Sequence, residues 1–157
     1  MAFEKAKACL ERFGLADRII ETDSSSATVA EAAKALGCGE AMIAKTLSFL
    51  QDGKPVLILA DGVARVDNRK YKDVFGCKAK MIPADLVGPL TGHETGGVCP
   101  FGVNEGVRVY LDESLRKHET VYPAAGNDHS GVRLTIPELE KCSGSSGWVD
   151  VCRQPGD

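Results

Sequence analysis

A glycine-rich segment at residues 96–102 has the composition of a ligand-binding loop. Its sequence is Gly96-Gly97-Val98-Cys99-Pro100-Phe101-Gly102, without a charged side chain. Glycine allows positive φ and close backbone approach, while proline fixes φ and removes one donor. The segment therefore predicts a shaped loop whose N–H groups could stabilise a carbonyl oxygen that becomes an oxyanion during acyl transfer. A tight structural turn is the alternative interpretation of such a segment taken alone.

Lys45 is the one charged residue in the run from Met42 to Leu50, which has the character of a β-strand. Alternation places Ile43, Lys45 and Leu47 on the more apolar face of that strand. An unpaired ammonium group is costly on such a face. The side chain is therefore expected either to extend outward to solvent or to be held in a cleft. In a cleft it could bind a phosphate or help to polarise water.

The two motifs occur together at a fairly specific spacing. Ala44-Lys45-Thr46-Leu47 is followed about fifty residues later by the glycine-rich segment. In this combination the chain resembles the YbaK/EbsC family of aminoacyl-tRNA deacylases, which is related to the editing insertion of bacterial prolyl-tRNA synthetases. The resemblance runs from about Thr22 to Cys142 and includes residues 28–37, Arg65-Val66-Asp67 and Ala125-Gly126.

The resemblance implies both a fold and an activity. The fold would be α/β, one YbaK-like domain over residues 1–157, with a mixed, largely antiparallel, barrel-like sheet flanked by helices. The activity would be trans-editing hydrolysis of a mischarged aminoacyl-tRNA, with alanine, cysteine or serine on tRNA-Pro. The partners would be the acceptor 3′ end and prolyl-tRNA synthetase. A non-catalytic module that binds aminoacyl-tRNA or a synthetase is the alternative.

The same resemblance implies roles for individual residues. Lys45 would hold the phosphate of the 3′-terminal adenosine, and the backbone of Gly97, Val98 and Cys99 would stabilise the oxyanion while water attacks, helped by a ribose hydroxyl. No cofactor or metal is implied. The residues expected to contact the substrate are Ser25, Ser26, Thr28, Gly96, Pro100, Phe101, Gly126 and Asn127.

Two positions depart from the family pattern. Many members carry serine where this chain has Cys99, so a thiol nucleophile is an alternative, although the sequence provides no evident histidine partner for it. Some cysteinyl-tRNA deacylases of the group carry an acidic residue near the position of Arg133, so cysteine specificity cannot simply be transferred. The six cysteines form no CxxC pair, and we expect free thiols rather than a zinc site.

Basic residues are concentrated in one stretch of an otherwise acidic chain. The chain has a net charge of −3 over 157 residues, which argues against a general polyanion-binding protein. Between residues 65 and 80, six cations face two acids, and we expect a salt-sensitive contact with tRNA phosphates there. A solvated helix face is the alternative. The cations proposed to contact tRNA are Arg65, Arg69, Lys70 and Lys72.

The remaining sequence predicts the elements that position these residues. Capping boxes at Thr28/Glu31 and Thr135/Glu138 indicate two helix starts, and Asp67 caps a third helix. No apolar run approaches the roughly 20 residues needed to span a membrane, and without a signal sequence a cytoplasmic protein is expected. The expected helices are 3–13, 28–37, 68–75, 83–90 and one after Thr135, and the expected strands are 19–21, 42–50, 55–60, 107–111, 119–123, 132–136 and 148–151, with a flexible connector at 143–147.

The histidines carry little signal. Asp128-His129-Ser130 has the residue types of a triad, but adjacent side chains point apart and cannot form its hydrogen-bonded relay. His93-Glu94 lacks the second histidine of a zinc motif, which leaves His93 a supporting role at the rim of the pocket. No role is predicted for His118.

Overall fold

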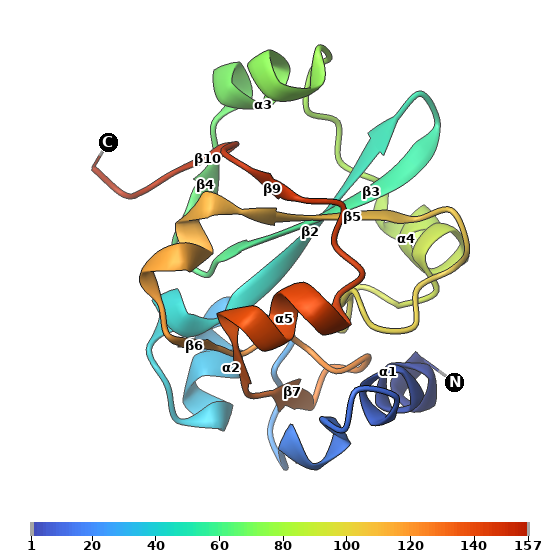
Figure 1. Cartoon of the computed structure of the whole chain (residues 1–157), viewed down its shortest axis with the longest axis vertical. Helices are drawn as coiled ribbons and strands as arrows, with labels where there is room; N and C mark the ends of the chain where they lie inside the picture. Colours follow the sequence, from blue (N-terminus) through green and yellow to red (C-terminus); the bar gives the residue numbers. More distant parts are fainter. Residues whose placement is uncertain (1, 157) are drawn as a thin grey trace.

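The computed structural model describes residues 2–156, and a mixed four-stranded sheet forms its centre. The sheet order is β2 (Ala44–Gln51), β3 (Lys54–Asp61), β5 (Arg108–Asp112) and β9 (Trp148–Val149) (Figure 1). β2 and β3 pair in antiparallel fashion, whereas β3–β5 and β5–β9 are parallel. The β2–β3 hairpin turns at Asp52 and Gly53 with φ values of 52° and 76°, as an Asp-Gly hairpin requires.

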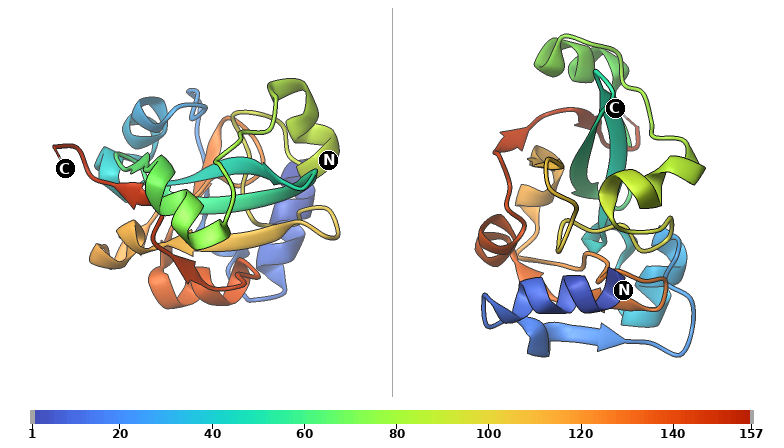
Figure 2. Two further views of the ribbon diagram at one scale, coloured as in Figure 1. Left: turned by 90° about the horizontal axis from the view of Figure 1, so that it is seen from above. Right: turned by 90° about the vertical axis from the view of Figure 1, so that its right-hand side faces the viewer.

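Five α-helices and three short 3₁₀ segments surround this sheet in the described chain. In Figures 1 and 2, α3 lies beyond one end of the hairpin and α1 at the opposite end of the molecule. The helices are α1 (Ala2–Glu11), α2 (Val29–Leu36), α3 (Asn68–Phe75), α4 (Ala84–Thr91) and α5 (Ile136–Cys142), and the 3₁₀ segments are η1 (Ala16–Arg18), η2 (Glu40–Met42) and η3 (Glu113–Lys117).

The predicted helix starts are confirmed, but the box predicted at Thr28 is incomplete, because the Glu31 carboxylate accepts from the Thr28 hydroxyl. Thr28 accepts a hydrogen bond from the Glu31 N–H, and Thr135 forms a full capping box with Glu138. Asp67 accepts from the backbone N–H groups of the first turn of α3. Each cap satisfies N–H groups that have no partner inside the helix.

The remaining strands are short and pair in twos. The antiparallel pairs are β1 (Ile19–Glu21) with β7 (Ser130–Val132), β4 (Arg65–Val66) with β10 (Cys152–Arg153), and β6 (Thr120–Val121) with β8 (Leu134–Thr135). The central sheet ends at β2 and β9 within residues 2–156. The mixed α/β prediction is therefore confirmed, but the sheets are not closed into the predicted barrel.

Three predicted strands are shorter than expected, and the one at 148–151 is a strand only over Trp148–Val149. Only Thr120–Val121 of 119–123 is a strand, and the region 132–136 divides between β7, β8 and the start of α5. Thr135 caps α5 and so ends β8. The connector at 143–147 is hydrogen-bonded to β5, because Ser146 N–H donates to Val109 O and Leu111 N–H donates to Gly147 O.

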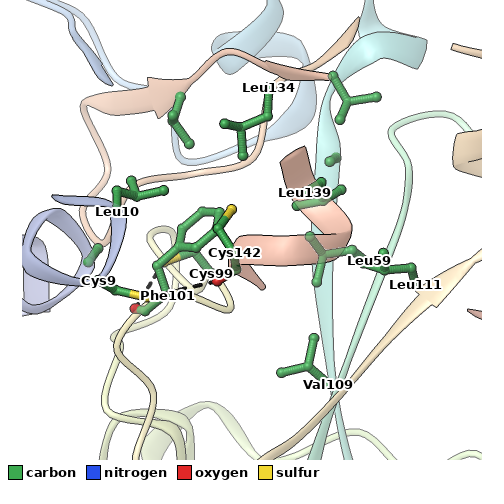
Figure 3. Close-up of a cluster of buried hydrophobic side chains, with 14 of the residues drawn as sticks. Cys9, Leu10, Leu59, Cys99, Phe101, Val109, Leu111, Leu134, Leu139 and Cys142 are labelled. Carbon is green, nitrogen blue, oxygen red and sulfur yellow. Dashed lines mark hydrogen bonds between the residues drawn. The ribbon is translucent and has the colours of Figure 1, made fainter. Parts of the chain in front are cut away.

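The core lies on both faces of β3. Leu57 and Leu59 belong to one cluster, which α1, α5 and the segment around Phe101 complete (Figure 3). Val56, Ile58 and Ala60 face the other way, into a cluster closed by Tyr71 of α3 and by Val149. A strand buried on both faces is expected where neighbours cover both sides of a sheet. Among the described residues, no helix is long and apolar enough to cross a membrane.

Candidate active site

A cavity of about 290 Å³ opens beside β2. The start of α2 contributes Ser26 and Thr28, β2 contributes Lys45 and Thr46, and the glycine-rich loop contributes Val98. Most of the other lining residues are small or aliphatic side chains. The volume is near the lower end of the roughly 300–1,000 Å³ found for small-molecule sites. The cavity therefore suits a ligand of the size of one small amino acid.

A second cleft is lined by Lys45 together with Glu40, Arg65 and Arg153. Because Lys45 also lines the cavity, it stands where the two meet. Its half-buried ammonium donates to the backbone carbonyls of Gly62, at 3.3 Å, and of Ala64. An ammonium group has three N–H donors, so one remains for a ligand oxygen. Burial lowers the pKa of Lys45 below its ordinary value, and the Arg65 charge acts in the same direction. The structure thus places Lys45 in a cleft rather than extended into solvent.

A buried carboxylate fixes the turn that holds Lys45. Asp61 is 0% exposed and accepts hydrogen bonds from Val63 N–H at 2.8 Å, His118 Nε2 at 2.7 Å and Lys117 Nζ at 3.0 Å. Burial by itself raises the pKa of Asp61, but these hydrogen bonds outweigh it and the net pKa lies below the ordinary value. The turn from Asp61 to Ala64 presents the carbonyls that bind Lys45, so this cluster positions the lysine.

This cluster was not predicted from the sequence, which indicated no role for His118. The pairing of His118 with Asp61 spans 57 residues, and no local spacing indicates it. The available signal was Asp61 itself, an acid directly after the apolar run 55–60. A buried acid at the end of an apolar strand needs hydrogen-bonding partners from elsewhere in the chain.

The glycine-rich loop owes its path to close backbone packing. A Cβ atom on Gly97 would lie 2.7 Å from the backbone of Asn127, and Gly96 has φ of 94°. The Gly97 N–H donates to Glu94 O at 3.0 Å, so this predicted oxyanion donor is already engaged. Within residues 2–156, the backbone N–H groups of Val98 and Cys99 donate no hydrogen bond. Of these two residues, Val98 lines the cavity, whereas Cys99 is fully buried and does not line it.

The side chains of Cys99 and Phe101 lie outside the cavity, and for Phe101 this differs from the predicted substrate contact. Both are fully buried in the cluster of Figure 3, together with Cys9 and Cys142. Cys99 Sγ lies 3.6 Å from His93 Nε2, which itself donates to Phe101 O at 2.6 Å. Burial raises the pKa of Cys99 far above its ordinary value. The thiol therefore stays protonated at neutral pH, and His93 is a core residue instead of a residue of the pocket rim.

We predict that Cys99→Ala leaves the catalytic rate within about threefold of wild type, since a protonated, buried thiol is a poor nucleophile. The smaller side chain should lower the melting temperature, because removing buried atoms leaves a cavity. Deacylation time courses and thermal melts of Cys99→Ala and Cys99→Ser would check this. A loss of more than 100-fold in both variants, with both still folded, would restore the thiol-nucleophile alternative.

The other predicted substrate residues divide between two surfaces. Ser26 and Thr28 line the cavity. Ser25 does not, since its hydroxyl bonds Glu31 and the Ala27 N–H. Gly126 and Asn127 lie on an open cleft on the other side of the glycine-rich loop. Pro100 is buried and lines neither surface.

Thr46 is a cavity residue that the sequence analysis did not select. Its buried Oγ1 has no hydrogen-bonding partner within the part of the chain that the structure describes, which is unusual because buried polar groups are normally paired. Strand alternation already placed Thr46 and Ser48 on the face opposite Lys45, and both line the cavity. Alternation therefore predicted the strand face on which Thr46 lies, but nothing in the sequence indicated that a cavity lies against that face.

The predicted tRNA-contacting cations also separate. Arg65 lines the second cleft with Lys45, while Arg69 and Lys72 are exposed on α3. Lys70 instead donates to Asp150 Oδ1 at 3.1 Å and to Cys152 O at 3.0 Å. No group of three or more potential metal-binding side chains gathers anywhere in residues 2–156.

Comparison with known proteins gives consistent matches over most of the chain. Residues 23–142 match the model of the aminoacyl-tRNA editing domain. YwhH of Bacillus subtilis, an uncharacterised protein, is 42% identical over 98% of both chains. A proline–tRNA ligase of Citrifermentans bemidjiense is 30% identical over 79% of this chain but only 22% of the ligase. A crystal structure provisionally described as a trans-editing enzyme for prolyl-tRNA synthetase superposes with a TM-score of 0.86, at 30% identity over 97% of both chains.

Proposed function

The chain belongs to the aminoacyl-tRNA editing domain family, and from its site we propose that it is a trans-editing hydrolase. Its substrate would be tRNA-Pro mischarged with a small noncognate amino acid, namely alanine, cysteine or serine. The observation that carries the proposal is the position of Lys45, between a cavity of amino-acid size and a cationic cleft. The likeness to the trans-editing structure and to part of a proline–tRNA ligase supports the same tRNA.

In the proposed complex, Lys45 binds the phosphate of the 3′-terminal adenosine. Two of its N–H groups stay on Gly62 O and Ala64 O, and the third reaches the phosphate. This contact fixes the ester carbonyl relative to the protein, and such positioning can supply several kcal/mol of the barrier reduction. The Asp61 cluster keeps the turn at 61–64 in place and so orients the lysine.

The ester carbonyl would lie beside the glycine-rich loop, where the N–H group of Val98, which lines the cavity, stabilises the oxyanion. A water molecule, assisted by the free hydroxyl of the terminal ribose, attacks the carbonyl carbon. The bond between that carbon and the ribose oxygen then breaks, and the ribose oxygen takes a proton. No protein nucleophile takes part, in agreement with the buried position of Cys99.

The amino-acid side chain would occupy the cavity beside Thr46. The unpartnered Thr46 Oγ1 offers a hydrogen bond to a polar group of the ligand, while aliphatic residues such as Val29 and Val87 limit its size. One methylene in such a pocket changes binding by only about 1–3 kcal/mol. We therefore expect graded preferences among alanine, cysteine and serine instead of absolute selection.

A deacylation panel tests the proposal. tRNA-Pro is charged separately with alanine, cysteine, serine or proline, and ester loss is followed with and without the protein. We expect protein-dependent loss of at least one noncognate ester, and the cognate prolyl ester should persist. Binding of the tRNA without loss of any ester would favour the alternative, a non-catalytic module that recognises aminoacyl-tRNA or a synthetase.

A further inference from the structure

The second cleft, of about 690 Å³, carries a pair of arginines that the catalytic proposal does not use. Arg65 on β4 and Arg153 on β10 are direct partners in the antiparallel register, so both side chains lie on one face of that two-stranded sheet. Both line the cleft together with Lys45. β10 lies outside residues 23–142, the part that matches the editing domain. Arg153 therefore adds a positive charge to the cleft from outside the segment that matches the family model.

The described part of the chain provides no ion-pair partner for these two arginines. Within residues 2–156, Glu40 is the one acidic residue that lines the cleft. Asp67 is near enough to Arg153 to be affected by its charge, but the carboxylate already caps α3 through Arg69 and Lys70 N–H groups. Like charges on directly opposed residues destabilise a strand pair, which favours an anionic ligand between them.

The C-terminal strand is held firmly in this position. Lys70 Nζ bonds Cys152 O and Asp150 Oδ1, and the Asp67 N–H donates to Val151 O at 2.8 Å. These contacts join β10 to α3 and fix Arg153 opposite Arg65. Lys70, which the sequence suggested as a tRNA contact, therefore acts as the anchor of this strand.

We propose that the cleft binds the phosphodiester backbone of single-stranded RNA, at the nucleotides that precede the terminal adenosine. The inference rests on the proposed function, which sets the direction of the RNA strand. The amino acid lies in the cavity, the terminal phosphate at Lys45, and the preceding phosphates between Arg65 and Arg153. Arginine suits this role because its planar fork donates two hydrogen bonds to one phosphate. The pair holds the strand and takes no part in the chemistry.

Binding of an uncharged RNA oligonucleotide that ends in CCA tests the cleft directly. Fluorescence anisotropy would compare wild type, Arg65→Gln, Arg153→Gln and the double variant, with Arg12→Gln as the matched control. Arg12 is exposed next to α1, at the opposite end of the molecule. We expect a 3- to 10-fold weaker Kd for each single variant and a salt slope smaller by about 0.7 for each lost contact. An unchanged Kd in the folded double variant would overturn the proposal, as would equal competition by inorganic phosphate and by the RNA.

A second readout separates this inference from the proposed function. The ratio of deacylation rates on aminoacyl-tRNA and on 3′-aminoacyl-adenosine 5′-monophosphate, which keeps the phosphate for Lys45 but lacks the preceding phosphates, should fall 5- to 20-fold in the double variant. If the wild-type protein binds the RNA through both arginines but hydrolyses neither substrate, the proposed hydrolase function is wrong and the proposed RNA-binding cleft stands. A wild-type enzyme whose ratio is unaffected by the double substitution would refute the cleft alone.

Discussion

Lys45→Ala is expected to lower the deacylation rate by about 100-fold or more, the magnitude typical of losing a group that positions or stabilises the reacting centre. Lys45 lines both the cavity and the second cleft, and the other cations of that cleft, Arg65 and Arg153, belong to different strands. Single-turnover deacylation of the preferred substrate would measure the loss. The fold should persist, because the ammonium binds only two backbone carbonyls at a half-buried edge strand.

Two further variants make this result specific. Lys54→Ala removes an exposed lysine at the start of β3 and should leave the rate within twofold of wild type. Lys45→Arg keeps the charge, but its planar donors fit the carbonyls of Gly62 and Ala64 differently, so only partial activity is expected. If Lys45→Ala hydrolyses the ester at the wild-type rate, the lysine does not bind the substrate phosphate and the proposed mechanism is wrong.

The parts of the fold that could be predicted from sequence are those set by neighbouring residues. Thr28 with Glu31 and Asp67 before residues 68–75 marked helix starts that the structure confirms. The alternation along 42–50 correctly separated the Lys45 face from the Thr46 face. In each case hydrogen bonds or side-chain directions within a few residues determine the structure.

The parts that could not be predicted depend on contacts between distant segments. Cys99 lies in the core because α1 and α5 close over it, and its own loop gives no sign of that. Asp61 finds His118 across 57 residues, and Arg153 meets Arg65 through the pairing of two short strands. Two-residue strands such as β4 and β10 are too short to show alternation, so their partners are defined only by the tertiary structure.

The glycine-rich loop combines a feature that the sequence predicts with one that it does not. Its glycines indicated a backbone that approaches something closely, but the sequence suggested a ligand as the neighbour. In the structure the close neighbour of Gly97 is the backbone of Asn127. The loop and the turn at 126–128 therefore support each other, and the position of the Val98 N–H group depends on that contact. The role of Gly97 is to allow the approach, while its own N–H is bonded to Glu94.

Gly97→Ala should consequently displace the loop and reduce deacylation by about 100-fold, since errors of the order of 1 Å in an active site can have this effect. The added Cβ would meet backbone atoms of Asn127 at 2.7 Å, and backbone cannot move aside as a flexible side chain can. Overpacking of this kind typically destabilises a protein by about 1–3 kcal/mol. Deacylation rates and thermal melts would be measured on the same preparation.

Gly39→Ala is the matched control, because a Cβ there meets no atom within 4 Å and its φ of −74° suits alanine. Its rate and melting temperature should equal or slightly exceed those of wild type. Binding of the CCA oligonucleotide at the Arg65–Arg153 cleft, which Gly97 does not line, reports whether Gly97→Ala is folded. Retained RNA binding with lost hydrolysis would place the defect in the loop itself. Wild-type hydrolysis by Gly97→Ala would mean that the loop position does not control the oxyanion donor.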